Sequence, residues 1–327
     1  MDTKIKWGIV GPGKIATDFT EDLKLAPDAD VAAVASRSLG RAQQFADKYN
    51  IPNVFRSYDE LFNSDTVDIV YVATPHNFHK NLAIQAIESG KHVLCEKPLG
   101  VNRAEVEEIV AAAKANGVFM MEGLWSRFNP SVRKAKQMVD DGIIGEVGYL
   151  HADFAFYALD RSMDSRLLNP ELASGSLLDI GIYPIFLAYL ILGMPREIMA
   201  KSNFHENGTE LQTSMLFHYE NAQAVLYSGL TSKSKMEAEI SGTKGEIFIH
   251  PRWHEADSCR LEKDGKTQEF ELPRQGNGFV YEIEEVHQCL IAKKLESDLW
   301  SHQNSLDVAK LLDIIREKCG ITFPFEG

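Results

Sequence analysis

The sequence has few cysteines and lacks the patterns that would give them a shared role. Its 327 residues contain four, none of them in a CxxC pair: Cys95, Cys259, Cys289 and Cys319. Such wide spacing argues against a disulfide framework and against a zinc site. We interpret them as small core or surface residues.

Long apolar segments are also scarce. The start MDTKIKW has no apolar core of signal-peptide length. The longest apolar stretch, residues 180–192, contains Gly181 and Pro184 and is too short to span a bilayer. We therefore expect a cytoplasmic protein with no membrane partner.

Positive charge is in deficit, with 34 Lys and Arg against 47 Asp and Glu and a net charge of -13. A nucleic acid or anionic membrane partner would demand an excess of basic surface, so the composition argues against both. The 44% hydrophobic and 25% charged content is that of an ordinary globular protein, and the length suffices for two domains. We expect them at residues 1–123 and 124–327.

The most informative motif that is present is GPGKIA, at residues 11–16 behind an apolar run. Gly11 allows a tight turn, Gly13 lets the backbone approach a pyrophosphate, and Ala16 lets a helix pack close to the preceding strand. The N-terminus of that helix then presents N–H groups to the phosphates. The alternative is an ordinary tight turn. The expected cofactor-binding residues of this motif are Gly11, Gly13, Lys14, Ile15 and Ala16.

Apolar runs alternate with helical patterns through the first 123 residues, as in a parallel sheet. The expected strands are 5–10, 31–35, 68–73, 92–95 and 118–121, and the expected helices are 14–25, 39–49, 77–89 and 103–116. The predicted fold class of this half is α/β, a doubly wound Rossmann sheet.

The residues that follow the second predicted strand indicate which cofactor binds. An acidic residue there would hydrogen-bond an adenosine ribose hydroxyl, whereas arginines accommodate a 2′-phosphate. The chain has Ser36, Arg37 and Arg41 and no acid between Val31 and Ala46. We therefore predict NADP, with NAD as the second choice. The alternative is that both arginines are solvated charges at a helix start.

Two further segments follow strands, where open α/β sheets bind ligands. TPHNFH occupies residues 74–79 and CEKP occupies residues 95–98. Pro98 keeps Lys97 out of the helical region, and a lysine so placed can be desolvated for proton transfer. The expected cofactor contacts from these segments are Thr74, Pro75, His76, Asn77, His79, Glu96 and Lys97.

These motifs, in this order, resemble the Gfo/Idh/MocA oxidoreductases. WSRF at 125–128, LLDIGIY at 177–183, SGTKG at 241–245 and ITFP at 321–324 resemble its branch of dimeric dihydrodiol dehydrogenases and NADP-dependent D-xylose dehydrogenases. The resemblance implies a C-terminal α+β domain with a large, mostly antiparallel sheet, and no metal. It also implies a catalytic Lys97 and a cis Lys97–Pro98 bond.

The resemblance places Tyr183 where many relatives carry a histidine base. Tyr183 and Asp179 are polar members of the apolar helical segment 176–192, and the alternative is that they only satisfy each other or a backbone carbonyl. Gly181 between them weakly favours close approach to a ligand. The expected substrate contacts are Trp125, Arg127, Phe154 and Phe279.

The second half reads as a helical region at 124–142, then strands, then two helices. The expected strands are 147–156, 197–204, 211–219, 222–230, 235–241, 246–250, 259–263 and 268–272, and the last helices are 280–292 and 306–319. Residues 215–217 and 225–227 are apolar on both faces of the sheet. Helices would cover one face and a partner subunit the other, which predicts a homodimer.

The expected reaction is hydride transfer between NADP and a carbinol carbon of a sugar, polyol or dihydrodiol. Tyr183 would take the hydroxyl proton, Lys97 would stabilise its phenolate, and Asp179 would orient the pair. Which of Lys97 and Tyr183 meets the substrate oxygen stays open. The alternatives are a nucleotide-bound regulator without catalysis and an NAD-assisted glycosidase.

Overall fold

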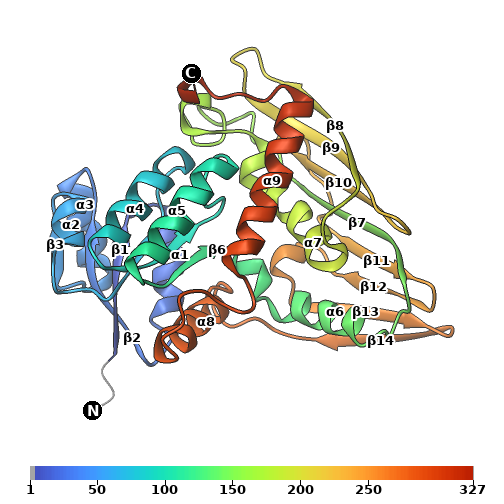
Figure 1. Cartoon of the computed structure of the whole chain (residues 1–327), viewed down its shortest axis with the longest axis horizontal. Helices are drawn as coiled ribbons and strands as arrows, with labels where there is room; N and C mark the ends of the chain where they lie inside the picture. The colour runs from blue at the N-terminus through green and yellow to red at the C-terminus, as the bar shows by residue number, and fades with distance from the viewer. Residues whose placement is uncertain (1–3, 327) are drawn as a thin grey trace. The chain divides into compact units, whose positions relative to one another are not determined.

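The computed structural model describes residues 4–326, which form two compact units (Figure 1). Unit 1 comprises residues 4–125 and 275–306, and unit 2 comprises 126–274 and 307–326. The chain first passes from unit 1 to unit 2 after residue 125, close to the expected division at residue 123. The later segment 275–306 packs with the N-terminal unit, although it was expected in the second domain.

Unit 1 is built on a six-stranded sheet of order β3-β2-β1-β4-β5-β6, in which every neighbouring pair is parallel. The strand order reverses between β1 and β4, which is where open α/β sheets bind ligands. The strands are β1 (Ile5–Val10), β2 (Ala29–Ala35), β3 (Asn53–Phe55), β4 (Ile69–Val72), β5 (His92–Glu96) and β6 (Met120–Gly123).

Five helices of unit 1 connect these strands, with α4 and α5 side by side, and α8 contacts α1 (Figure 1). The helices of this unit are α1 (Lys14–Leu23), α2 (Leu39–Tyr49), α3 (Tyr58–Phe62), α4 (His79–Glu88), α5 (Arg103–Asn116) and α8 (Val280–Ile291). The predicted doubly wound α/β fold is confirmed. The sequence prediction missed β3 and α3.

Unit 2 is built on an eight-stranded sheet of order β14-β13-β12-β11-β7-β10-β9-β8. Only the β7–β10 pair is parallel, so the predicted mostly antiparallel sheet is confirmed. The strands are β7 (Val147–Ala155), β8 (Glu197–Phe204), β9 (Glu210–His218), β10 (Gln223–Gly229), β11 (Ala238–Gly242), β12 (Gly245–Ile249), β13 (Ser258–Lys263) and β14 (Lys266–Glu271).

Helices cover one face of this sheet. In unit 2, α7 (Ile182–Leu192) packs on β7 and β10, and α6 (Pro130–Asp140) packs on β12 and β13. Most of α9 (His302–Cys319) also belongs to this unit. Side chains on the opposite face stay accessible, with 50% of Met199, 41% of Val225 and 38% of Tyr149 exposed. The alternation of buried and exposed residues along the strands therefore gives the sheet one covered and one open face.

The apolar segment of unit 2 is longer than expected. Residues Pro170–Leu192 are long and apolar enough to cross a membrane by length and composition, but 78% of that apolar window is buried inside the structure. Burial of this extent is typical of a core helix.

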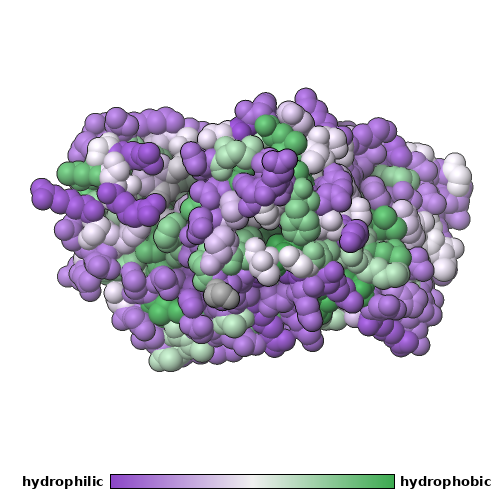
Figure 2. Space-filling model, turned by 90° about the horizontal axis from the view of Figure 1, so that it is seen from above, coloured by the Kyte–Doolittle hydropathy of each residue, from purple (hydrophilic) through white to green (hydrophobic). Residues whose placement is uncertain are grey.

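In the view of Figure 2, hydrophilic side chains dominate the visible surface and hydrophobic ones form patches among them.

The four cysteines carry no cross-links. Each is a free thiol, and all but Cys319 are buried. Within residues 4–326, no group of three or more His, Cys, Asp or Glu side chains is placed to hold a metal ion.

Candidate active site

The GPGKIA turn joins β1 to α1 in unit 1. Gly11 has a φ of +88°, and a Cβ there would lie 2.9 Å from Cγ2 of Thr74, so the turn needs glycine. A Cβ on Gly13 would meet nothing within 4 Å. No side chain caps α1, and its first turn holds no acid. The helix N-terminus therefore suits an anionic group. Lys14 is exposed, Ile15 half-buried and Ala16 buried against the sheet.

The segment after β2 carries the predicted arginines. The Arg37 guanidinium lies 4.9 Å from the Phe78 ring centroid, a cation–π contact. Burial raises the pKa of Tyr58, and the positive charge of Arg37 opposes that rise. Arg41 is exposed, whereas Ser36 is buried and its Oγ accepts the N–H of Ser38 at 3.2 Å.

In the segment after β4, the hydroxyl oxygen Oγ1 of Thr74 is buried and has no hydrogen-bond partner. Pro75 and Asn77 are half-buried, and His76 is buried with its ring centroid 5.7 Å from that of His79. A buried hydroxyl without a partner suits a ligand that could supply one.

His79 is fully buried, unlike a residue that contacts a ligand. Its Nδ1 lies 2.8 Å from the carbonyl of Pro98 and its Nε2 lies 2.8 Å from the carbonyl of Thr74. Burial lowers the pKa of His79, and both carbonyl contacts oppose that fall. Each ring nitrogen thus faces a backbone carbonyl, to only one of which a neutral imidazole can donate, and the direct contact between His79 and the cofactor stays a prediction.

Lys97 is half-buried at the end of β5, and its peptide bond to Pro98 is cis, as the resemblance implied. Its backbone N–H donates to Oε2 of Glu96 at 3.2 Å, and the Tyr71 hydroxyl donates to Oε1 of the same carboxylate. The next N–H, that of Leu99, donates to Oε1 of Glu122 at 3.0 Å. Glu96 is 5% exposed, and its hydrogen bond from the Lys97 N–H holds the Lys97 backbone.

Buried acids surround this turn. Burial raises the pKa of Glu122, and hydrogen bonds from Ser305, Leu99 and Trp300 together with the charge of Lys97 oppose that rise. Burial and the charges of Glu96 and Asp22 raise the pKa of Glu282 well above its usual value. The neutral form of Glu282 is therefore favoured more strongly than that of a free carboxyl group.

Tyr183 and Asp179 lie in unit 2, within one helical segment that changes form between them. Residues Leu177–Gly181 form a π-helical turn and α7 begins at Ile182. Asp179 is 3% exposed and accepts Nη1 of Arg166 at 2.6 Å. Tyr183 is 5% exposed. The buried carboxylate thus has a cationic partner, Arg166, that the sequence analysis did not assign.

Gly181 lies close to a strand of its own unit. A Cβ at this position would lie 2.9 Å from Oγ of Ser228 on β10. The absent side chain therefore lets the π-helical turn pack against the sheet, and the approach of a ligand to Gly181 stays a prediction.

The ring of Tyr183 has aromatic neighbours in unit 2. Its centroid lies 5.5 Å from that of Phe154 and 5.4 Å from that of His254. The rings of Phe154 and His254 stack at 4.1 Å. His254 could not be predicted from the sequence, because the loop between β12 and β13 carries no motif that indicates contact with α7.

Trp125 and Phe279 form the corresponding aromatic pair in unit 1. Their rings stack at 4.8 Å with an interplanar angle of 22°. Arg127 lies at the end of the adjoining 3₁₀ turn and is half-buried. The structure thus brings Trp125 together with Phe279, and Phe154 together with Tyr183, each pair within one unit.

The comparisons with known proteins agree along the chain. Residues 5–124 match the model of an oxidoreductase family with an NAD-binding Rossmann fold, and residues 132–248 match the GFO/IDH/MocA C-terminal domain. Trans-1,2-dihydrobenzene-1,2-diol dehydrogenase of Mus musculus is 37% identical, covering 98% of each chain. The enzyme of that name from Xenopus tropicalis is 35% identical over 98% of this chain and 99% of the relative.

Solved structures of similar fold include two bacterial enzymes. KijD10, a 3-ketoreductase from Actinomadura kijaniata solved with NADP and TDP-benzene, is 27% identical with a TM-score of 0.88. Aldose-aldose oxidoreductase from Caulobacter crescentus, complexed with glycerol, is 26% identical with a TM-score of 0.88. Each match covers 97% of this chain and 98% of the other.

Proposed function

This chain belongs to the Gfo/Idh/MocA oxidoreductase family and is an NAD(P)-dependent oxidoreductase that acts on carbinols, and from that premise we propose NADP-dependent oxidation of a vicinal diol. The observation that supports this proposal is that the chain is 37% identical in sequence to a dihydrodiol dehydrogenase along nearly its whole length. Sugars are the second substrate class, because an aldose oxidoreductase shares the fold at 26% identity.

The residues of unit 1 fit the cofactor. The uncapped N-terminus of α1 suits the pyrophosphate, and Arg37 with Arg41 suits a 2′-phosphate. The unpartnered Thr74 hydroxyl offers a donor and an acceptor beyond β4. When bound, the nicotinamide supplies the hydride transfer.

We assign proton transfer to Lys97 and Tyr183. A free tyrosine has a pKa of about 10, so a phenol that works near pH 7 to 8 needs a fall of roughly two to three units, or about 3 to 4 kcal/mol. The ammonium of Lys97 supplies a charge of the required sign. Its backbone is held by Glu96, which limits where the side chain can extend.

The role of Asp179 differs from the expected one. Its carboxylate is neutralised by Arg166 at 2.6 Å, so the negative charge opposes the ionisation of Tyr183 less than an unpaired aspartate would. We propose that Asp179 positions the π-helical turn that precedes Tyr183, and that Arg166 belongs to the same set.

We further propose a homodimer formed through the open face of the unit 2 sheet. The half-exposed side chains of Met199, Val225 and Tyr149 on three strands give that face an apolar centre. Such exposed patches favour association. A monomeric mass at micromolar concentration would contradict this. We also propose a cytoplasmic location, consistent with four unpaired thiols.

The test is absorbance at 340 nm during incubation with NADP or NAD and a panel of trans-dihydrodiols, aldoses, inositols and glycosides. Net NADPH formation with a diol supports the proposal. Release of free sugar at constant absorbance would instead identify an NAD-assisted glycosidase. Tight NADP binding with no turnover on the whole panel would favour a regulator.

A further inference from the structure

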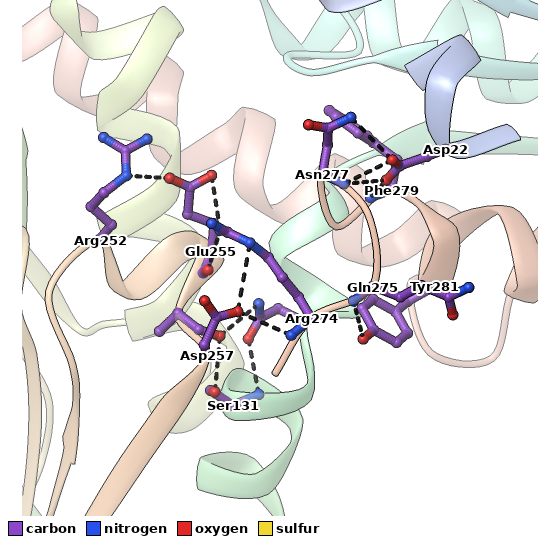
Figure 3. Close-up of polar contacts among 12 residues, drawn as sticks. Asp22, Ser131, Arg252, Glu255, Asp257, Arg274, Gln275, Asn277, Phe279 and Tyr281 are labelled. Atoms are coloured by element: carbon purple, nitrogen blue, oxygen red, sulfur yellow. Dashed lines mark hydrogen bonds and ion pairs between the residues drawn. The ribbon is translucent and has the colours of Figure 1, made fainter. Parts of the chain in front are cut away.

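Asp22 on α1 holds the backbone that leads into Phe279 (Figure 3). Its side chain is buried, at 1% exposed, and both carboxylate oxygens accept backbone N–H groups. The N–H of Asn277 donates to Oδ1 at 2.7 Å, and the N–H of Phe279 donates to Oδ2 at 2.8 Å. The Asn277 side-chain amide adds bonds to Oδ1 at 3.1 Å and to the backbone carbonyl of Asp18 at 3.2 Å. Hydrogen bonds to an ionised acceptor are roughly twice as strong as neutral ones.

The segment reaches Asp22 only because residue 276 has no side chain. Gly276 has a φ of +59°, and a Cβ there would lie 2.3 Å from Oδ1 of Asp22. The chain enters unit 1 at Gln275, whose N–H donates to the Tyr281 hydroxyl on α8 at 2.9 Å. In unit 2, the preceding Arg274 is bound by Glu255 and Asp257 (Figure 3).

The ring of Phe279 is placed by aromatic contacts on two sides. It stacks on Trp125 at 4.8 Å and meets Phe19 edge to face at 5.9 Å. Phe19 lies on α1, one turn before Asp22, so this helix contacts both the ring and the backbone of residue 279. Aromatic pairs depend on such offsets, which a displaced backbone would change.

We propose that Asp22 is a positioning residue for substrate specificity: it sets the place of the Phe279 ring against Trp125 and so the shape of the aromatic wall they form. The proposal rests on the proposed function and on the prediction that Trp125 and Phe279 contact the diol. Because α1 also offers its N-terminus to the cofactor phosphates, one helix would carry both the cofactor contact and the support of the wall.

Three variants test this from different sides. Asp22→Ala removes both acceptors, and Asp22→Asn keeps one carbonyl oxygen. Gly276→Ala pushes the segment away while leaving Asp22 intact. Asp30→Ala, an exposed acid of the same unit, is the matched control. A fifth variant, Phe279→Leu, removes the aromatic ring at this position and shows the effect with which the Asp22 variants are compared.

The expected result in Asp22→Ala is amide hydrogen exchange in peptide 275–281 at least about tenfold faster, with no change in Asp30→Ala. The KM for a trans-dihydrodiol should rise about tenfold while the KM for NADP and kcat change less than about threefold. Gly276→Ala should repeat this pattern, and Asp22→Asn should be intermediate.

Two results would overturn the proposal. Unchanged exchange in peptide 275–281 would mean that Asp22 does not hold the segment. Faster exchange with an unchanged KM for the diol, or with equal rises in both KM values, would reduce Asp22 to a general stabiliser of the fold.

If the wild type oxidises no diol or sugar, the proposed function fails and tryptophan emission decides this proposal instead. Asp22→Ala should then reproduce the emission change of Phe279→Leu, because both move the Phe279 ring from Trp125. An emission spectrum identical to wild type would overturn it.

Discussion

The phenol ring of Tyr183 lies beside the imidazole of His254, with ring centroids 5.4 Å apart and an interplanar angle of 47°. The resemblance to the family implied that this chain lacks the usual histidine base, because a tyrosine occupies its position on α7. His254, in the loop between β12 and β13, places an imidazole next to Tyr183. An imidazole can exchange a proton near neutral pH, so it can assist the ionisation of a phenol.

We predict that His254→Phe lowers kcat about tenfold, because it keeps an aromatic ring against Phe154 but removes the titratable nitrogens. The measurement is kcat for diol oxidation between pH 6 and pH 8, with the urea midpoint as a control for folding. A variant with wild-type kcat and the same pH profile would exclude His254 from proton transfer.

The choice of cofactor is tested at Arg37. Its guanidinium, placed over the Phe78 ring, can form charge-assisted bonds to a 2′-phosphate. Arg37→Ala should therefore raise the KM for NADPH about tenfold or more and leave the KM for NADH within about threefold. Arg56→Ala, another exposed arginine of unit 1, is the control. A wild-type preference for NADH would contradict the assignment.

Stability should fall below pH 6.5. Burial lowers the pKa of His79 and of His287 in the folded protein, and Nε2 of His287 accepts the indole N–H of Trp7 at 3.0 Å. Above pH 6.5 both rings are neutral in either state. Below it the unfolded chain binds protons that the folded chain does not, so the free energy of unfolding falls by up to about 1.4 kcal/mol per pH unit for each ring. Urea unfolding at pH 5.5 and 7.5 measures this, and His287→Gln should reduce the slope.

Glu282 should have the opposite pH dependence. Its pKa is raised in the folded protein, and both carboxyl oxygens are buried without a hydrogen-bond partner. Above pH 4.5 the unfolded chain ionises this group more readily than the folded chain does, so unfolding becomes easier as pH rises. Glu282→Gln cannot ionise, and its unfolding free energy at pH 8 should exceed that of the wild type by at least about 1 kcal/mol. Glu284→Gln, exposed on the same helix, should change little. A stability difference between the Glu282→Gln variant and the wild type that is the same at pH 5 and pH 8 would show that folding does not raise the pKa of Glu282.

Local sequence patterns were enough to predict most elements. β1, α2 and α5 begin and end where their apolar periodicity and flanking residues placed them. β3 has only three residues and is half-buried throughout, so it lacks the alternation that marks a strand. The π-helical turn before α7 was also missed, because its packing against Ser228 depends on a strand far along the chain.

Some residues of the candidate site could be predicted from local sequence patterns and others could not. GPGKIA and CEKP are contiguous and could be recognised in the sequence, whereas His254 and Arg166 reach Tyr183 and Asp179 only through tertiary structure. The support of Phe279 by Asp22 joins residues 257 apart, which no local pattern records.

The most direct test compares NADPH formation at 340 nm from a trans-dihydrodiol in the wild type, Lys97→Met and Tyr183→Phe. The account predicts turnover in the wild type, none detectable in Lys97→Met although it still binds NADPH, and a loss of about a hundredfold or more in Tyr183→Phe. Near-normal turnover in Lys97→Met would contradict it.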